Sequence, residues 1–286
     1  MKENLLDKGD YQGNRRQEHR DHLSLQELER QIQSRWLGSS LCYYDKIDST
    51  NLEAKRLAAS GLPEGTVVVA DLQESGRGRL GRNWASPAGC GLWMSMILRP
   101  SFLPVQASMV TLVAAMAVMD AIEEVSGVQV QIKWPNDLVA EGRKVCGILT
   151  EMSMEENRIR FIICGMGVNV NNDCFPEELE QKAISLSMLT GKKLSRAKLA
   201  AAVCRFFEKY YEDFLVRQNL GGIKNAYNAR LVNRNQKVVI SDGAGSFTCV
   251  SEGIDETGAL LVRREDGTRQ AISSGEVSVR GLYGYV

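Results

Sequence analysis

Glycine and arginine alternate in a short run, GRGRLGRNW, that spans residues 76–84. Glycine lets the backbone expose its N–H groups and lets an anion approach closely. The side chains of Arg77, Arg79 and Arg82 add guanidinium groups, which bind phosphate or carboxylate through paired donors. The run therefore predicts a loop that binds a small anion, although an arginine–glycine run taken alone could equally be a solvated surface loop.

Residues 76–81 also match the G-x-G-x-x-G pattern of dinucleotide-binding folds, and they follow a predicted strand. The sequence that follows does not fit that fold. Pro87 and Gly89 come soon after the third glycine, so no helix begins there, and no acidic residue lies about 20 residues further on. The P-loop and protein-kinase signatures are absent too.

Histidine is nearly missing from the chain, since His19 and His22 are the only two and both lie in a charged N-terminal segment. This argues against a Ser-His-Asp or Cys-His nucleophile and against a histidine metal site. The seven cysteines show no C-x-x-C spacing, which predicts reduced thiols. The chemistry must therefore rest on arginine, lysine, aspartate and backbone amides.

Length and charge place the chain among ordinary globular proteins. Its 286 residues suffice for one large domain or two unequal ones. The formal net charge is zero, so no global field would attract nucleic acid or an anionic membrane. No apolar run approaches the ~18–20 residues of a membrane span, and residues 1–22 lack the apolar stretch of a secretory signal. We therefore expect a cytoplasmic protein without membrane attachment.

Hydrophobic periodicity predicts alternating strands and helices up to about residue 232. The predicted strands cover 41–47, 66–72, 91–98, 128–134, 144–153 and 158–170. The predicted helices cover 24–36, 49–60, 106–126, 195–217 and a short segment ending near 232.

After residue 235, short apolar runs are separated by DG, ETG and EDG turns, which is typical of a small β-barrel. We therefore divide the chain into a polar N-terminal tail with a short helix (1–40), a catalytic domain (41–234) and a small C-terminal domain (235–286).

Several separated motifs together make the chain resemble the biotin protein ligases, also called holocarboxylase synthetases. The run at 76–84 matches their G-R-G-R-x-G-R-x-W signature. Other matching stretches are DSTN at 48–51, KWPND at 133–137, KVCGIL at 144–149 and GMGVN at 165–169. The resemblance covers about residues 40–286. It implies an α+β fold, in which a mixed β-sheet flanked by helices, as in class II synthetases, precedes an SH3-like barrel.

The resemblance also implies an activity. Such an enzyme joins biotin to ATP as biotinyl-5′-AMP, with Mg²⁺, and transfers biotin to a lysine of a biotin carboxyl carrier protein or carboxylase. The implied biotin-binding residues are Ser49, Thr50, Gln73, Gly76, Arg77, Arg79, Lys144, Gly147, Gly165 and Gly167. The implied ATP-binding residues are Arg77, Arg79, Arg82, Trp84, Asn136, Asn169, Lys237 and Arg280. The candidate catalytic residues are Arg79, Lys144 and Asp137, and Asp137 is also the candidate metal ligand.

These residue types suit the chemistry. A carboxylate is already ionised near neutral pH, so adenylation needs no general base, only cations that bring two anions together. In the second step the acceptor lysine, with a pKa near ~10.4, is mostly protonated. Asp137 is the side chain that we expect to orient it or accept a proton.

Some of these residues have plainer interpretations. Ser49 and Thr50 could simply begin a helix as its N-cap. Asn136 and Asp137, next to a proline, could form an Asx-turn. Trp84 could be a core residue instead of a wall for the adenine.

Two other functions compete with biotin ligation. One is a related ligase or transferase for lipoate or octanoate, and the other is a non-catalytic nucleotide- or RNA-binding module. Family members that also act as repressors carry a winged-helix domain before the catalytic core. The segment before residue 41 is short and polar, so we expect no such domain and no specific DNA binding. A homodimer remains open.

The loop at 75–90 is expected to be mobile without ligand. Its arginines have no evident acidic neighbour in the sequence beyond Glu74. Backbone entropy and mutual repulsion would then favour an open loop that folds over biotin and ATP.

Overall fold

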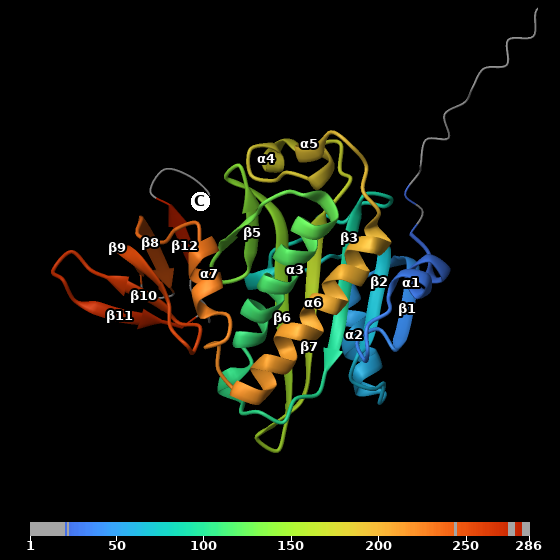
Figure 1. The fold of residues 1–286 in the computed structure, drawn as a ribbon, viewed down its shortest axis with the longest axis horizontal. Helices are drawn as coiled ribbons and strands as arrows, with labels where there is room; N and C mark the ends of the chain where they lie inside the picture. The colour runs from blue at the N-terminus through green and yellow to red at the C-terminus, as the bar shows by residue number, and fades with distance from the viewer. Residues whose placement is uncertain (1–20, 22, 243–244, 274–277, 282–286) are drawn as a thin grey trace, which may run out of the picture.

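The computed structural model describes residues 21, 23–242, 245–273 and 278–281. A large mixed sheet with helices on both faces is followed by a smaller antiparallel sheet (Figure 1). The expected α+β class with a helix-flanked mixed sheet is therefore confirmed. Apart from Asp21, the tail expected at 1–22 lies outside the described residues, and so do both histidines.

The large sheet has the strand order β1-β2-β3-β7-β6-β5-β4. Strands β1 and β2 are parallel, and the other neighbours are antiparallel. The strands are β1 Ser40–Ile47, β2 Thr66–Gln73, β3 Gly91–Leu98, β4 Gln131–Lys133, β5 Asp137–Ala140, β6 Arg143–Glu155 and β7 Arg158–Asn169.

The helices begin and end where local sequence directs them. Ser24 caps α1 by accepting a hydrogen bond from Glu27 N, and Gly127 ends α3 in the left-handed conformation. The α-helices are α1 Leu25–Gln31, α2 Thr50–Ala59, α3 Met109–Ser126, α4 Glu177–Glu180, α5 Leu186–Thr190, α6 Arg196–Arg217 and α7 Lys224–Arg230. Two 3₁₀ turns are η1 Arg79–Gly81 and η2 Pro104–Gln106.

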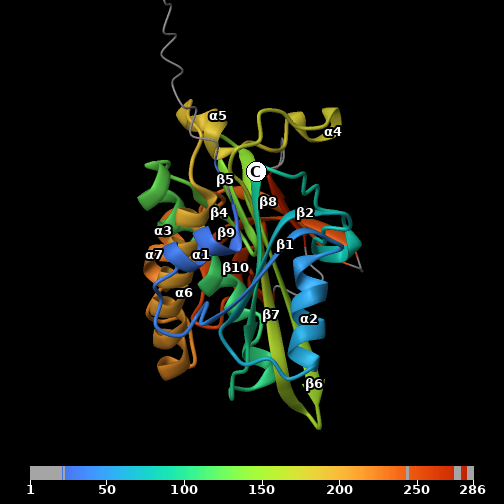
Figure 2. The ribbon, with the colours of Figure 1, turned by 90° about the vertical axis from the view of Figure 1, so that its right-hand side faces the viewer.

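The two faces of the large sheet carry different layers. Figure 2 shows α2 on one face and α1, α3 and α6 on the other. Along β7, Cys164 and Met166 belong to the core beneath α3 and α6, whereas Ile163 packs beneath α2. Because side chains alternate along a strand, Gly165 and Gly167 fall on the α2 face. At this end of the sheet, the α2 face is therefore lined by glycine.

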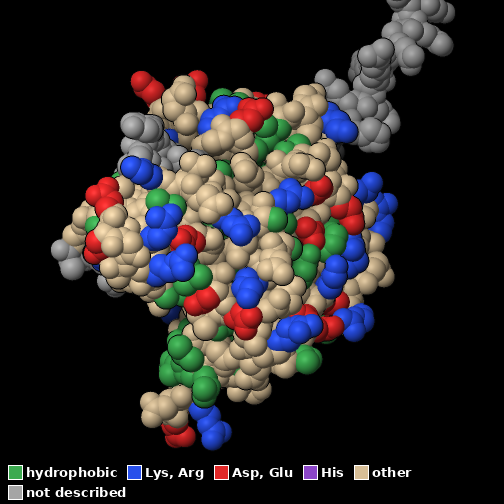
Figure 3. All heavy atoms as spheres, turned by 60° about the vertical axis from the view of Figure 1, so that its left-hand side comes forward, with side chains coloured by type: hydrophobic (Ala, Val, Ile, Leu, Met, Phe, Trp, Pro, Cys, Tyr) green, Lys and Arg blue, Asp and Glu red, His purple; other side chains and the backbone are tan. Residues whose placement is uncertain are grey.

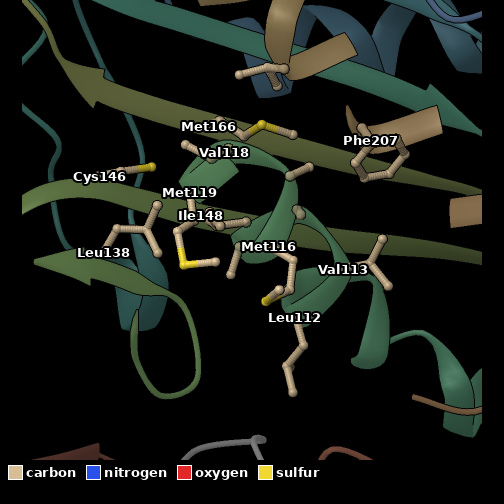
Figure 4. Close-up of a cluster of buried hydrophobic side chains, with 14 of the residues drawn as sticks. Leu112, Val113, Met116, Val118, Met119, Leu138, Cys146, Ile148, Met166 and Phe207 are labelled. Atoms are coloured by element: carbon tan, nitrogen blue, oxygen red, sulfur yellow. The ribbon is translucent and has the colours of Figure 1, made fainter. Parts of the chain in front are cut away.

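Helix α3 forms the centre of the main core. Its Leu112, Met116 and Met119 pack with residues of the sheet such as Ile148 and Met166 (Figure 4). By length and composition alone, the segment 104–126 would pass as a membrane span, contrary to the expectation from sequence. Within the fold, 72% of its most apolar window is buried, so the segment serves as a core helix.

Helix α1 is shorter than expected, because Ile32 is already extended and residues 35–37 then bind a buried carboxylate. Glu208, on α6, is only 4% exposed. Its carboxylate accepts hydrogen bonds from the backbone N–H groups of Arg35, Trp36 and Leu37, at 3.1, 2.7 and 2.8 Å. These amides have no helical carbonyl to bind, so Glu208 satisfies them.

Replacing Glu208 by glutamine should lower the free energy of unfolding by about 1.5–3 kcal/mol, the usual range for charge-assisted hydrogen bonds. The amide keeps the shape but replaces one acceptor oxygen with a donor that faces N–H groups. Urea unfolding followed by circular dichroism measures the change. An unchanged unfolding midpoint would show that the three amides do not depend on the carboxylate.

The sequence predicts one strand at 128–134, but only residues 131–133 form a strand, β4. The chain then reverses direction. Pro135 has no N–H to donate, and Lys133 pairs with Asp137 across the turn. Residues 137–140 return as β5, which the sequence analysis missed. The KWPND motif is therefore the turn of a hairpin.

The C-terminal segment forms a five-stranded antiparallel sheet with the order β11-β10-β9-β8-β12. Its strands are β8 Lys237–Asp242, β9 Gly245–Ile254, β10 Leu260–Arg263, β11 Arg269–Ile272 and β12 Ser278–Gly281. Among the described residues, no pairing closes it into the barrel that the sequence predicted. Trp134 Nε1 donates to Gly258 O at 3.0 Å and so connects the KWPND turn to this sheet.

Candidate active site

Two connected compartments open on the α2 face of the large sheet. The inner one has a volume of about 50 Å³ and the outer one about 1320 Å³. Both are lined by Gln73, Gly78, Arg79, Trp84, Asn136 and Lys144. The inner compartment adds Ser49, Thr50, Arg77, Gly147, Gly165 and Gly167 to this shared set, so most of the predicted site residues meet here.

Glycines on β6 and β7 make room for the inner compartment. Gly147 pairs with Gly167 across the two strands. A Cβ on Gly167 would lie 2.5 Å from Trp84 Nε1, and one on Gly147 would lie 2.9 Å from Trp84 Cζ3. A Cβ on Gly165 would lie 1.8 Å from Asn51 Oδ1. The sheet thus needs glycine here so that the Trp84 ring and the Asn51 amide can lie directly on its backbone.

A hydrogen-bonded network of small polar side chains lies around the inner compartment. Gln73 Oε1 accepts from Thr50 N at 2.8 Å and from Thr50 Oγ1 at 3.0 Å, while Gln73 Nε2 donates to Ser86 Oγ at 2.7 Å. The Ser95 hydroxyl lies 2.8 Å from Thr50 Oγ1 and 2.7 Å from Asn51 Oδ1. These groups provide uncharged donors and acceptors, which suit a neutral polar head group.

Ser49 stands at the N-cap position of α2, but its side chain makes no capping hydrogen bond. It is 1% exposed and lines the inner compartment. Ser49 therefore begins α2 through its backbone, and its side chain is left to line the site.

The glycine–arginine loop folds into a small hairpin over the site. Trp84 N donates to Gly76 O at 2.8 Å, and Gly78 N donates to Arg82 O at 2.7 Å. A Cβ on Gly76 would lie 2.3 Å from Trp84 O, so the two arms of the hairpin need glycine here. Gly76 lies between these arms and does not itself line either compartment.

The three loop arginines differ in their surroundings. Arg77 forms an ion pair with Glu151 at 3.3 Å. Arg79 Nη1 donates to Asn136 Oδ1 at 2.9 Å. Burial lowers the pKa of the Arg79 guanidinium from its usual value, Asp137 opposes the shift, and Arg82 adds to it. Arg82 is exposed and lines only the outer compartment.

The expectation that the loop arginines lack acidic partners beyond Glu74 is wrong. Glu151 is distant in the sequence and reaches Arg77 from β6. Glu74 itself pairs with Lys46 at 2.7 Å. Repulsion among the arginines is therefore partly relieved before any ligand binds.

Limited digestion with trypsin should cut the ligand-free protein after Arg82 faster than after Arg77 or Arg79. Arg77 and Arg82 are both exposed, but the Arg77 guanidinium is paired with Glu151, and the Arg79 guanidinium contacts Asn136. Biotin and ATP together should suppress cleavage at all three sites, as mass spectrometry of timed samples would show. Equal cleavage with and without ligands would contradict closure of the loop on binding.

A lysine–aspartate pair stands where the two compartments meet. Lys144 Nζ lies 2.6 Å from Asp137 Oδ1 and 4.9 Å from the centre of the Trp84 ring. The backbone of Lys144 is held on two sides, since its N–H donates to Lys182 O at 2.7 Å and its carbonyl accepts from Asn169 Nδ2 at 3.2 Å. The pair therefore has a fixed position beside both compartments.

Asn136 is also held by the sheet, because its Nδ2 donates to Ile148 O at 3.1 Å and its backbone carbonyl accepts from Ile148 N at 2.9 Å. No Asx-turn is needed to explain its conformation. Its remaining oxygen faces Arg79.

Sequence reasoning missed several residues around the site. They are Asn51, Ser86, Ser95, Lys133 and Glu151. Lys133 is 6% exposed and lines the outer compartment, and its place in the KWPND motif could have identified it. Ser86 and Ser95 have no sequence signal, because a serine hydroxyl carries no diagnostic spacing.

Two predicted ATP-binding residues lie apart from this cavity or cannot be placed. Lys237 is exposed at the start of β8 and lines neither compartment. The side chain of Arg280 lies outside the described part of the chain. The C-terminal sheet instead reaches the outer compartment through Val279 of β12.

Comparison with known proteins agrees with this arrangement. Residues 43–169 match the biotin/lipoate A/B protein ligase family, and residues 235–280 match the biotin protein ligase C terminal domain. The biotin–[acetyl-CoA-carboxylase] ligase of Paracoccus denitrificans is 33% identical over 241 residues, which cover 82% of this chain and 99% of that one. The chain belongs to the biotin protein ligase family.

Other members of the biotin protein ligase family extend the comparison. The bifunctional ligase/repressor BirA of Bacillus subtilis is 40% identical over 255 residues, which cover 88% of this chain and 78% of that protein. The structure of the biotin protein ligase from Aquifex aeolicus in complex with biotin and ATP superposes with a TM-score of 0.74. It is 32% identical, over 85% of this chain and 99% of that one.

Proposed function

We propose that this protein is an ATP-dependent biotin protein ligase, which forms biotinyl-5′-AMP and transfers biotin to a lysine of a biotin carboxyl carrier protein or carboxylase. One observation carries the proposal. A small compartment of neutral hydrogen-bonding groups meets a much larger one where Arg79 and Lys144 line both. Biotin's ureido ring would occupy the first compartment and ATP the second, with carboxylate and α-phosphate meeting beside the two cations.

The roles of the residues follow from their places. Ser49, Thr50 and Gln73 would bind the ureido ring, while Gly147, Gly165 and Gly167 line the same compartment and let Trp84 and Asn51 lie close to the sheet. Arg77, Arg79 and Lys144 would hold the carboxylate and α-phosphate. Arg82, Trp84, Asn136 and Asn169 line the outer compartment and would contact the nucleotide. We propose the same role for Lys237, which lines neither compartment, and for Arg280, whose side chain lies outside the described part of the chain.

In the first step, a carboxylate oxygen of biotin attacks the α-phosphorus of ATP, and pyrophosphate leaves as the bond to the β-phosphate breaks. Arg79 and Lys144 would stabilise the negative charge on the pentacoordinate phosphorus. No proton is transferred, which agrees with a site built without histidine.

In the second step, the acceptor lysine attacks the carbonyl carbon of biotinyl-AMP, the amide bond forms, and AMP leaves. The attacking amine must lose a proton, and Asp137 would orient it and accept that proton. The ion pair with Lys144 keeps Asp137 beside the place where the adenylate forms.

Mg²⁺ would accompany ATP. In the part of the chain that the structure describes, no three His, Cys, Asp or Glu residues cluster as a metal site. One carboxylate, that of Asp137, suits Mg²⁺ that is bound mainly by phosphate oxygens and water. Such an ion would neutralise charge on the phosphates.

Two alternatives are less well supported. The named relatives quoted above are biotin ligases, which favours biotin over lipoate or octanoate. A non-catalytic RNA-binding module would not need the buried polar network or the Lys144–Asp137 pair.

Biotin-dependent exchange of labelled pyrophosphate into ATP tests the proposed first step directly. Lipoate and octanoate offered in parallel should support no exchange. Transfer is tested by adding a purified biotin carboxyl carrier domain and detecting labelled protein. Exchange with lipoate but not biotin would overturn the assignment of the inner compartment.

We expect no sequence-specific DNA binding. The net charge is zero, and on the face shown in Figure 3 basic and acidic side chains are interspersed instead of forming one basic patch. A gel-shift assay with random and operator-like duplexes, with biotin and ATP present, checks this. A discrete complex that resists salt would contradict it.

A homodimer and a cytoplasmic location also stay predictions. Analytical sedimentation would test the first, and cell fractionation would test the second.

A further inference from the structure

A buried arginine connects the N-terminal segment to Gly89, at the end of the loop at 75–90 that contains the glycine–arginine run. Arg196, the first residue of α6, is 2% exposed. Its Nε forms an ion pair with Asp21, and its Nη1 lies 2.6 Å from Asp71 Oδ1. Nη1 also donates to Gly91 O at 3.3 Å. Burial by itself would lower the pKa of Arg196, but hydrogen bonds to Asp71 and Asp21 more than offset this and raise it.

Asp71 connects this arginine to the loop. Its two carboxylate oxygens each accept from Gly89 N at 3.1 Å. Its backbone carbonyl accepts from Trp93 Nε1, also at 3.1 Å. The Trp93 ring meets the Trp84 ring edge-on, with 6.5 Å between centres. The position of Asp71 therefore determines where the loop rejoins the sheet and what supports the tryptophan of the site.

Asp21 supplies the second counter-charge from outside the catalytic domain. Its Oδ1 accepts from Arg196 N at 3.1 Å, and its Oδ2 accepts from Asn171 Nδ2 at 3.4 Å. Two residues later the chain is held again, where Leu23 O accepts from Tyr43 OH at 2.9 Å. A buried guanidinium needs close counter-charges to remain in place. Without Asp21, Arg196 would depend on Asp71 alone, and the bonds from Asp71 to Gly89 would be disturbed.

We propose that Arg196 is a positioning residue for adenylate retention, which holds the end of the glycine–arginine loop through Asp71 and requires Asp21 to complete its buried ion pairs. The N-terminal segment thereby contributes to the active site without touching the substrates. The inference rests on the proposed function for its effect on the adenylate, but not for its effect on the loop itself.

The test compares Asp21→Asn with Glu208→Gln. Each substitution removes one carboxylate that is buried or nearly so and that accepts hydrogen bonds from the backbone. The two differ in what they hold: among the described residues, Glu208 binds the amides of 35–37 and not the loop. Hydrogen exchange at Gly89, read by mass spectrometry of short overlapping peptides, reports the loop. Release of labelled biotinyl-AMP from the purified enzyme reports the site.

We expect Asp21→Asn to speed both exchange at Gly89 and release of the adenylate, the latter roughly three- to thirtyfold, as for coupling through a shared network. Glu208→Gln should leave both unchanged at a temperature where each variant is fully folded. Arg196→Lys keeps the charge but cannot span both carboxylates, so it should give an intermediate result, and it replaces Asp21→Asn if that variant does not fold.

Wild-type exchange at Gly89 and a wild-type adenylate lifetime in Asp21→Asn would overturn the proposal. So would an equal acceleration in Glu208→Gln, which would indicate general destabilisation. If the wild-type protein forms no adenylate at all, the proposed function fails, while exchange at Gly89 still tests the contact from Asp21 to the loop.

Discussion

Replacing Lys144 by methionine should slow biotin-dependent pyrophosphate exchange by about 10²- to 10³-fold, the usual cost of removing one preorganised charge from a transition state. Lys144 lines both compartments, and its ammonium group lies 2.6 Å from Asp137 and 4.9 Å from the centre of the Trp84 ring. Methionine keeps the unbranched stem as far as Cε and removes the ammonium group with its charge and its donors.

Two further variants make this result specific. Lys198→Met removes a lysine from the exposed surface of α6 and should leave exchange unchanged. Lys144→Arg retains the charge with a different geometry and should fall between the other two. Exchange close to wild type in Lys144→Met would mean that Lys144 does not stabilise the reacting phosphate.

Replacing Arg79 by glycine should release biotinyl-AMP before transfer, with a dissociation rate about 100-fold higher. The guanidinium of Arg79 lines both compartments and is held by Asn136, so it is placed to clamp the adenylate where the two halves join. The released adenylate is reactive and should label lysines of bystander proteins. The measurement is the ratio of biotin incorporated into added serum albumin to biotin incorporated into the carrier domain.

The control for this variant is Arg158→Gly, which removes an exposed guanidinium from the start of β7, outside both compartments. It should label only the carrier domain. Arg79→Lys should give an intermediate ratio, because an ammonium group lacks the planar pair of donors. If Arg79→Gly labels only the carrier domain, at the normal rate, then Arg79 does not retain the adenylate.

Parts of the fold with a strong local pattern were predictable from the sequence. The apolar run at 91–98 gave β3 with the observed bounds, and the long small-residue run gave α3. The sequence does not predict β5, because its four residues, 137–140, are too few to show the alternation of a strand. Their strand conformation depends on pairing with β6. The helix predicted at 24–36 is too long, because Ile32 is already extended and Glu208, far along the chain, binds the amides of residues 35–37.

The candidate site divides in the same way. Residues inside motifs, such as Gln73, Asn136 and Lys144, could be identified because the motif fixes their spacing. Their partners could not, because the ion pair of Glu151 with Arg77 and the contact of Ser95 with Thr50 depend on how distant strands and loops meet. The expected repulsion among the loop arginines rests on neighbours in the sequence, and Glu151, which partly relieves it, lies on β6. The mobility of the loop without ligand stays a prediction.

The three glycines beneath Trp84 and Asn51 limit how the specificity of this pocket can change. Where a pocket is walled by large side chains, trimming one of them deepens it. Here Gly147, Gly165 and Gly167 have no side chain to trim, and a side chain added at any of them would push against Trp84 or Asn51. Selection for ligands bulkier than the natural one would therefore have to act on α2 or on the loop, because this part of the sheet has nothing left to remove.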